Sequence, residues 1–197
     1  EMCIRDRVYD PYRRTAFIDH FLPLELPLPD FCRGDYKEVG DFVDQPYKQE
    51  IREEPGRLHL TLFRDGYVHQ GEPLPFRVEK RFSIPSREVE LPVTYRLTNN
   101  SPQTITVRFG IELNFALLSG HSPHAYYEIE GYNPHLDSMG ETEGVVAFRL
   151  VNRDLGLAIR IKVDPEATLW RFPIETVSQS ESGFERIYQA SSLLLHW

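Results

Sequence analysis

The sequence predicts an all-β fold, a large antiparallel β-sandwich. From residue 58 onward, apolar and polar residues alternate with a period of two, which is typical of strands with one buried face. Turn-forming runs such as NNSP (99–102) and NRDLG (152–156) separate these strands. Strands do not alternate with amphipathic helical segments, which argues against a parallel α/β sheet.

The most regular alternation is TITVRFGIELNFAL at 104–117, which predicts one very long strand. At about 3.3 Å per residue it would run roughly 45 Å, so we expect Gly110 to bend it midway. Its polar face would carry Arg108, Glu112 and Asn114. Further strands are expected at 58–63, 76–82, 89–97, 145–151, 157–163, 168–172 and 185–195.

Three short sequence signals add detail to the first three of these predicted strands. Asp65-Gly66 directly follows one apolar alternation and predicts a hairpin turn. Lys80 falls on the apolar side of the 76–82 strand. Pro92 indicates an edge or a bulge in the 89–97 strand, because proline cannot donate to a central ladder.

Residues 8–40 are predicted to be a linker or docking arm ahead of a sandwich domain at 41–197. The run from Asp10 to Leu22 predicts a short helix, with Asp10 as its cap, Pro11 at its first position and Pro23 ending it. The following PLELPLPDF is broken by three prolines and predicts an extended segment lying along another surface.

The two ends of the chain carry unusual signals. EMCIRDR at 1–7 resembles the translation of a transposase adapter used in sequencing libraries, and the alternative is an ordinary frayed terminus. It lacks the apolar stretch of a signal peptide. Trp197 directly follows an apolar strand, from which we expect truncation of the domain at that end.

Composition excludes several classes of protein. Thirty acidic against 22 basic residues give a net charge of −8, which argues against a nucleic-acid partner. No apolar run approaches the roughly 20 residues of a membrane span. Cys32 is the only cysteine beyond the suspected adapter, which favours a reducing compartment, the cytoplasm.

Histidines and carboxylates offer two candidate sites. His121, His124 and His135 share one predicted loop, but their spacing matches no strong metal template. Solvated loop histidines are therefore the favoured interpretation, and neither metal nor cofactor is predicted. Glu112, with Asn114 and a nearby histidine, has the groups for acid–base chemistry on a sugar ring. We favour instead a cross-strand ladder, in which Glu112 or Arg108 pairs with Arg96 or Arg81.

Four aromatic residues are candidate carbohydrate contacts, because flat rings stack on sugars: Trp170, Tyr126, Tyr127 and Tyr132. In a sandwich such residues are more often part of the core. No phosphate loop or nucleophile elbow is present in the sequence.

Three segments, at 10–22, 95–118 and 173–197, resemble the C-terminal β-sandwich of glycoside hydrolase family 57 enzymes, in particular the α-amylases and 4-α-glucanotransferases. The resemblance extends from Val8 to the end of the chain. It is strongest in a run that includes Arg14, Phe17, Asp19, His20, Phe21 and Leu22, and in VSQSESGFERIYQ at 177–189. These patterns are specific for the family and say little about chemistry.

The resemblance implies a galactose-mutarotase-like supersandwich within an enzyme that cleaves or transfers α-1,4-glucan. In that family the catalytic glutamate and aspartate lie on an N-terminal (β/α) barrel, of which this sequence contains no part, so no catalytic residue is assigned. The expected partners are this intramolecular barrel and, through the parent enzyme, an α-glucan or malto-oligosaccharide. Phe17, Asp19, His20 and Phe21 are the residues expected to dock on the barrel.

Three functions remain open. The favoured one is a non-catalytic module that braces the barrel and helps to hold glucan. The second is a mutarotase-like enzyme that uses His121 or His124 with Glu112, supported only by fold analogy. The third is a free-standing carbohydrate-binding domain.

Overall fold

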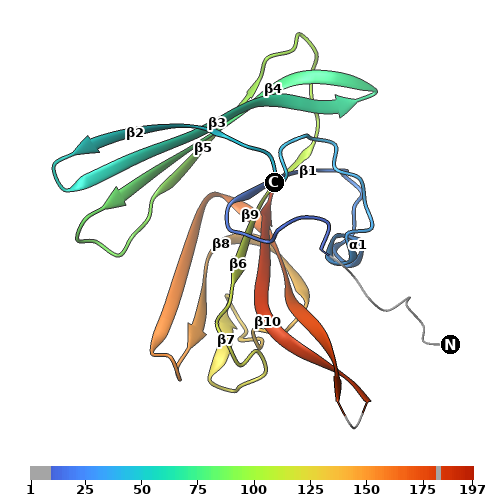
Figure 1. Cartoon of the computed structure of the whole chain (residues 1–197), viewed down its shortest axis with the longest axis vertical. Helices are drawn as coiled ribbons and strands as arrows, with labels where there is room; N and C mark the ends of the chain where they lie inside the picture. The colour runs from blue at the N-terminus through green and yellow to red at the C-terminus, as the bar shows by residue number, and fades with distance from the viewer. Residues whose placement is uncertain (1–9, 181–182) are drawn as a thin grey trace. The chain divides into compact units, whose positions relative to one another are not determined.

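The computed structural model describes residues 10–180 and 183–197, so the prediction for residues 1–7 lies outside the described residues. The chain divides into two compact units (Figure 1). The first unit comprises the described residues up to Asp19 together with Leu24–Tyr36 and Arg108–Trp197, and the second comprises His20–Pro23 and Lys37–Val107. No helix in the described ranges is long and apolar enough to cross a membrane.

A six-stranded sheet organises the first unit, and its edge strand Ile18–Leu22 passes into the second unit at His20. Its strand order is β1-β6-β10-β9-β8-β7, and the registered pairs among β6 to β10 are antiparallel. The strands are β1 (Ile18–Leu22), β6 (Arg108–Phe115), β7 (Ala125–Glu128), β8 (Gly140–Asn152), β9 (Leu157–Ser180) and β10 (Gly183–His196).

A four-stranded antiparallel meander organises the second unit, in the order β2-β3-β4-β5. Its strands are β2 (Lys48–Glu54), β3 (Arg57–Gln70), β4 (Glu72–Pro85) and β5 (Val93–Asn99). In the described residues these two sheets and one short helix confirm the predicted all-β antiparallel fold class.

Both faces of the six-stranded sheet are covered within its own unit. One face packs into a core to which β6, β8, β9 and β10 contribute, together with residues of the 117–136 region such as Leu117, Ile129 and Leu136. On the other face, the Phe31 ring lies 5.6 Å from that of Trp170 and 5.9 Å from that of Phe172. Away from these packed regions the same sheet still leaves apolar side chains in water, since Val146 is 55% exposed, Val177 46% and Ile187 44%.

The N-terminal region differs from the prediction. The helix expected at 10–22 is absent: residues 10–17 contain no helix, and Ile18–Leu22 form the fully buried strand β1. The described residues instead contain helix α1 (Leu28–Arg33), which begins inside the segment predicted to be extended and ends two residues beyond it. Its prolines stand at the N-cap and first turn, where a missing N–H costs nothing, and Gly34 ends it in the left-handed conformation.

The predicted hairpin at Asp65-Gly66 is wrong, because β3 runs through both residues and turns only at Gly71. A Cβ on Gly66 would lie 2.3 Å from Asp41 Oδ1, so the glycine is needed for a close approach of the chain. Lys80 does lie on the buried side of β4, with its ammonium 4.5 Å from the centre of the Tyr47 ring.

The long strand predicted at 104–117 is shorter than expected, since β6 covers only Arg108–Phe115. Gly110 again serves a close approach, since a Cβ there would lie 2.8 Å from Leu194 Cδ1. The strands predicted at 157–163 and 168–172 are one continuous strand, β9. The predicted start at Val89 is also too early, because β5 begins after Pro92.

Candidate functional site

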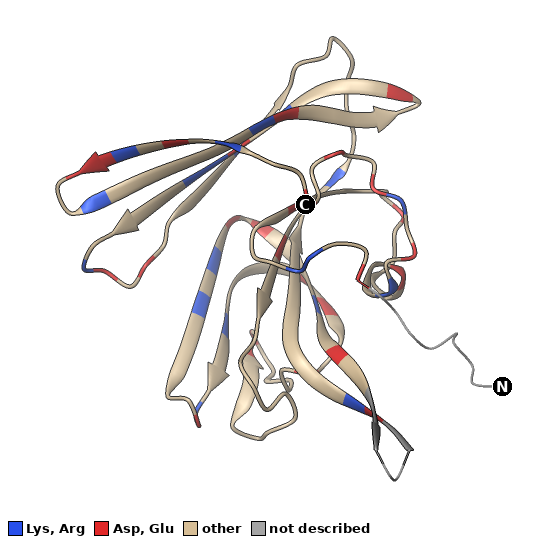
Figure 2. Cartoon of the chain, viewed as in Figure 1, with Lys and Arg blue, Asp and Glu red and all other residues tan. Residues whose placement is uncertain are grey.

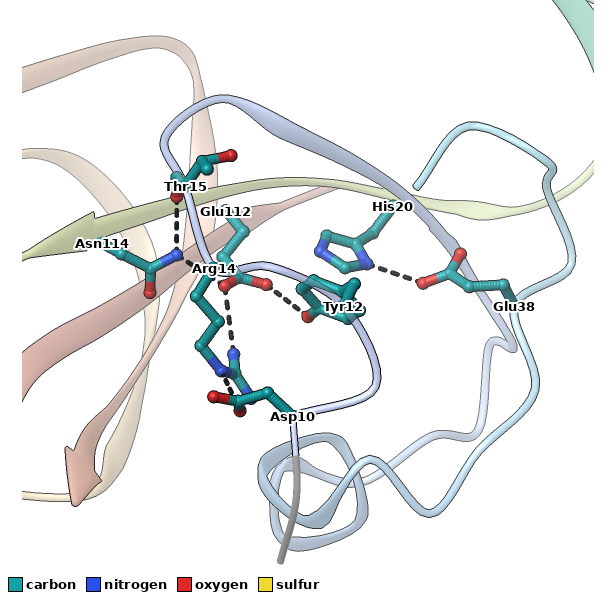
Figure 3. Close-up of polar contacts among 8 residues, drawn as sticks. All are labelled: Asp10, Tyr12, Arg14, Thr15, His20, Glu38, Glu112 and Asn114. Carbon is teal, nitrogen blue, oxygen red and sulfur yellow. Dashed lines mark hydrogen bonds and ion pairs between the residues drawn. The ribbon is translucent and has the colours of Figure 1, made fainter. Parts of the chain in front are cut away.

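The candidate site with the densest polar contacts is centred on Glu112, in the first unit. β6 places this carboxylate on the sheet face that the 10–15 segment covers, and its side chain is completely buried (Figure 3). Tyr12 donates to Oε2 at 2.6 Å, and Arg14 Nη1 donates to Oε1 at 3.0 Å. The Asn114 amide also donates to Oε1, at 2.7 Å.

The donors of Glu112 are themselves held in place. Asn114 Nδ2 also donates to the carbonyl of Thr15 at 2.7 Å, and Arg14 Nε donates to Asp10 at 2.6 Å. The Arg14 guanidinium lies 5.2 Å from the centre of the Phe172 ring, and the Arg14 side chain is only 7% exposed. The cluster therefore fastens the N-terminal segment to β6 (Figure 3).

Electrostatics fix the protonation states of two of these groups. Burial, and then the charge of Glu112, raises the pKa of Tyr12 well above its usual value. Burial alone would lower the pKa of Arg14, but the neighbouring Glu112 raises it overall. Tyr12 thus stays neutral and Arg14 stays charged, so neither exchanges a proton near neutral pH.

This arrangement is poorly suited to catalysis. The Glu112 carboxylate already accepts three hydrogen bonds and has no exposed surface, so a substrate proton has no route to it. The predicted ladder to Arg96 or Arg81 is wrong. Arg108 instead donates to the carbonyls of Leu24 and Leu26 and lies 5.2 Å from the Trp170 ring.

A second polar cluster lies in the second unit. The buried His20 ring contacts Glu38 Oε1 through Nδ1 at 2.6 Å, while the backbone N–H of Phe21 donates to Glu38 Oε2 at 2.9 Å (Figure 3). The Phe21 ring packs 4.9 Å from Phe42 and 5.2 Å from Phe76. Glu38 therefore closes a turn around β1 rather than facing a substrate.

The expected docking residues are mostly interior. Asp19, His20 and Phe21 are at most 1% exposed within the chain itself, so they have no surface with which to contact another domain. This corrects the docking assignment for these three residues. Phe17 is half-buried and packs against the core of the six-stranded sheet.

The three loop histidines each have a different partner. His121 Nδ1 lies 2.9 Å from Asp137, His124 Nδ1 lies 2.9 Å from Asp154, and His135 Nδ1 lies 3.2 Å from the Ser122 carbonyl. Although the rings of His121 and His135 stack, the described part of the chain holds no group of three His, Cys, Asp or Glu side chains placed to bind a metal ion.

The aromatic candidates for sugar contact separate into two groups. Trp170 is 2% exposed and its indole N–H donates to Glu141, while Tyr127 is completely buried in the core, so neither offers a ring face to a sugar. Tyr126 is half-buried beneath Arg153. Tyr132 is 42% exposed and bonds to Thr142.

The sequence singled out Glu112 and His20, the central residues of the two polar clusters, but not most of the residues that contact them. Arg14 lies in the run that carried the resemblance, yet its partner Glu112 is 98 residues away. Tyr12 and Glu38 gave no signal of their own. An open groove of about 400 Å³ over β7 to β9 contains none of the predicted site residues; its lining is Glu128, Ala147, Phe148, Arg149, Ala158 and Arg160.

The fold and these clusters define a class: an all-β domain whose most buried polar groups hold the chain together. Comparison with known proteins then identifies the family. Residues 3–197 match the family model described as alpha-amylase/4-alpha-glucanotransferase, C-terminal, and the chain belongs to that family.

Similar proteins are several times longer than this chain. It is 32% identical over 189 residues to a 4-alpha-glucanotransferase of Thermococcus litoralis, which covers 95% of this chain and 25% of that protein. It is 31% identical to alpha-amylase 1 of Dictyoglomus thermophilum, over 94% of this chain and 26% of that protein. The crystal structure of the Thermococcus litoralis enzyme matches 98% of this chain with a TM-score of 0.76, and 27% of the enzyme is covered.

Proposed function

We propose that this chain is a non-catalytic C-terminal domain of an α-1,4-glucan-acting enzyme of glycoside hydrolase family 57, either a 4-α-glucanotransferase or an α-amylase. Its role is to brace a catalytic barrel located elsewhere in the polypeptide. The observation that carries this proposal is that the chain spans about a quarter of relatives with those two names. We assign residues 8–40 and 41–197 to one such domain rather than to a separate linker and sandwich.

The polar clusters support a structural role. Glu112 is saturated by Tyr12, Arg14 and Asn114, and His20 is paired with Glu38. A mutarotase-like mechanism needs Glu112 and a histidine to face one sugar. His121 and His124 pair instead with Asp137 and Asp154, so the alternative has no matched acid and base.

The test is an assay on malto-oligosaccharides. The 197-residue chain, and the polypeptide encoded when its reading frame is extended at both ends, are each incubated with maltoheptaose, and products are separated by chain length. We expect shorter or redistributed oligosaccharides from the extended polypeptide alone. Hydrolysis, transfer or accelerated anomer exchange by the 197-residue chain would overturn the proposal.

Glucan contact by the domain itself, at Tyr132 and Tyr126, is a separate part of the proposal. Its support is that Tyr132 keeps 42% of its surface exposed. Titration calorimetry with maltoheptaose, on the chain and on the Tyr132→Ala variant, tests this part. Equal heats of binding for the two proteins would exclude Tyr132 as a glucan contact.

We also propose a cytoplasmic location. The support is that Cys32 is a free thiol, and disulfides are rare in the reducing cytoplasm. Fractionation of the source cells tests the location. Recovery of the protein in the secreted fraction would contradict the proposal.

A further inference from the structure

The β2–β5 sheet has two chemically different sides. Register places Ile51 opposite Leu60, Leu60 opposite Phe82 and Phe82 opposite Val93, so one row of apolar side chains crosses the whole sheet. Residues two positions before and after this row on each strand point to the same face of the sheet, because side chains alternate along a strand. We define the apolar face by its apolar aliphatic and phenylalanine members: Ile51, Leu58, Leu60, Leu62, Phe82, Ile84, Val93 and Leu97. The same side also carries Gln49, Glu53, the buried Lys80 and Tyr95.

The opposite side is polar apart from Phe63. It carries Lys48, Glu50, Arg52, Glu54, Arg57, His59, Thr61, Arg81, Thr94 and Arg96. Neighbours on this side bond to one another: Arg52 contacts Glu54 at 3.1 Å, and Arg57 donates to Ser83 at 2.9 Å. Figure 2 shows basic and acidic residues along these strands. This side is suited to water.

The apolar face is incompletely buried. Ile51 is 59% exposed, Leu97 is 39% exposed and Ile84 is 37% exposed, while Leu58, Leu60 and Leu62 are each half-buried. Antiparallel sheets usually have one solvated face and one face packed on other structure. Contiguous exposed apolar side chains of this kind mark an interaction surface.

We propose that the apolar face docks on the part of the same polypeptide that lies outside these 197 residues, and this rests on the proposed function. The relatives have the necessary chain, since this sequence covers about a quarter of their length. The chemistry favours protein over glucan, because sugars stack on flat aromatic rings, whereas the most exposed apolar members of this face are the aliphatic Ile51, Ile84 and Leu97 and its Tyr95 is half-buried.

The test is alkylation of single cysteines in matched pairs. In a background of Cys3→Ser and Cys32→Ser, Ile51→Cys and Leu97→Cys report on the apolar face, and Arg52→Cys and Arg96→Cys report on the polar face of the same two strands. Maleimide reaction rates are measured by mass spectrometry in the 197-residue chain and in the extended polypeptide, at several protein concentrations.

We expect all four cysteines to react readily in the 197-residue chain. In the extended polypeptide, positions 51 and 97 should react at least tenfold more slowly, while 52 and 96 are unchanged. Equal rates at all positions, or a reading frame that does not extend, would overturn the proposal. Slow reaction of positions 51 and 97 in the 197-residue chain alone would also overturn it. That protection could be present at every concentration, could increase with protein concentration because a second copy covers the face, or could appear only when maltoheptaose is added.

The two proposals fail separately. An extended polypeptide that processes maltoheptaose but leaves positions 51 and 97 reactive overturns only the docking surface. One that protects both positions but does not act on glucan keeps the docking surface and overturns the assigned activity.

Discussion

The two sheets of this protein differ in how far their apolar side chains are covered. The six-stranded sheet has cover on both faces within its own unit: Phe31 and Arg14 pack on one side, and a core including Leu136 and Leu193 lies on the other. The four-stranded sheet leaves side chains such as Ile51 and Leu97 partly in water. The six-stranded sheet also exposes Val146 and Ile187, so the two sheets differ in degree, and the docking proposed above would supply the cover that the second sheet lacks.

The largest effect expected is at the buried carboxylate. Glu112→Gln would leave the buried charge of Arg14 with only the partly exposed Asp10 as an ion-pair partner, at a cost of about 3–5 kcal/mol in the free energy of unfolding. Glu54→Gln is the matched control on the four-stranded sheet, where the exposed pair with Arg52 is worth about 0–1 kcal/mol. Urea unfolding followed by circular dichroism measures both, and equal losses would contradict the account.

Truncation of apolar side chains sharpens the same contrast. Phe31→Ala removes a side chain that is 1% exposed and covers Trp170, so we expect a loss of about 3 kcal/mol or more. Ile51→Ala, at 59% exposure, should change stability by less than about 0.5 kcal/mol in the 197-residue chain. Thermal unfolding curves compare the two, and a large loss for Ile51→Ala would show that its face is already covered.

The pH dependence of stability should come from the six-stranded unit. Burial, and then the charge of Arg108, lowers the pKa of His196 to about 4, and its ring lies 4.6 Å from that of Trp170. The unfolded state then binds a proton at higher pH than the folded state. Stability from this group is therefore complete above about pH 6.5 and is lost as the pH falls toward 4.

We expect this loss to be about 1–3 kcal/mol between pH 7 and pH 4.5. His196→Phe, which keeps an aromatic ring against Trp170, should flatten the dependence of the urea midpoint on pH. An unchanged slope for His196→Phe would refute the assignment.

The smallest effect is expected at Tyr12. Tyr12→Phe removes one of three hydrogen bonds to Glu112 and retains the ring, so the expected loss is about 1–2 kcal/mol. Tyr132→Phe, whose hydroxyl bonds to Thr142 at an exposed site, should cost less. Guanidinium unfolding resolves the two variants, and a Tyr132→Phe loss as large as that of Tyr12→Phe would contradict the account.

Local patterns in the sequence predicted the strands but not what covers them. Alternation identified the apolar side of β4, including Lys80, because the period of a strand is a property of consecutive residues. The same alternation made Glu112 look solvent-facing. It is buried because Tyr12 and Arg14 reach it from about 100 positions away, which periodicity does not report.

The turn and helix signals failed for a related reason. Asp65-Gly66 has the composition of a hairpin, but Gly66 is required by the approach of Asp41 and Phe42. The prolines around α1 suit the first turn of a helix as well as they suit an extended chain. In both cases tertiary packing selects between local conformations that the residues alone permit.

Hydrogen exchange on the 197-residue chain, alone and within the extended polypeptide, tests the contrast between the two sheets most directly. We predict slow exchange in β6 and in the described part of β9 in both proteins, because packed strands open only with global unfolding. Amides of β2 and β5 should exchange rapidly in the chain alone and slow at least tenfold in the extended polypeptide. Equally slow exchange of β2, β5 and β6 in the chain alone would contradict the account.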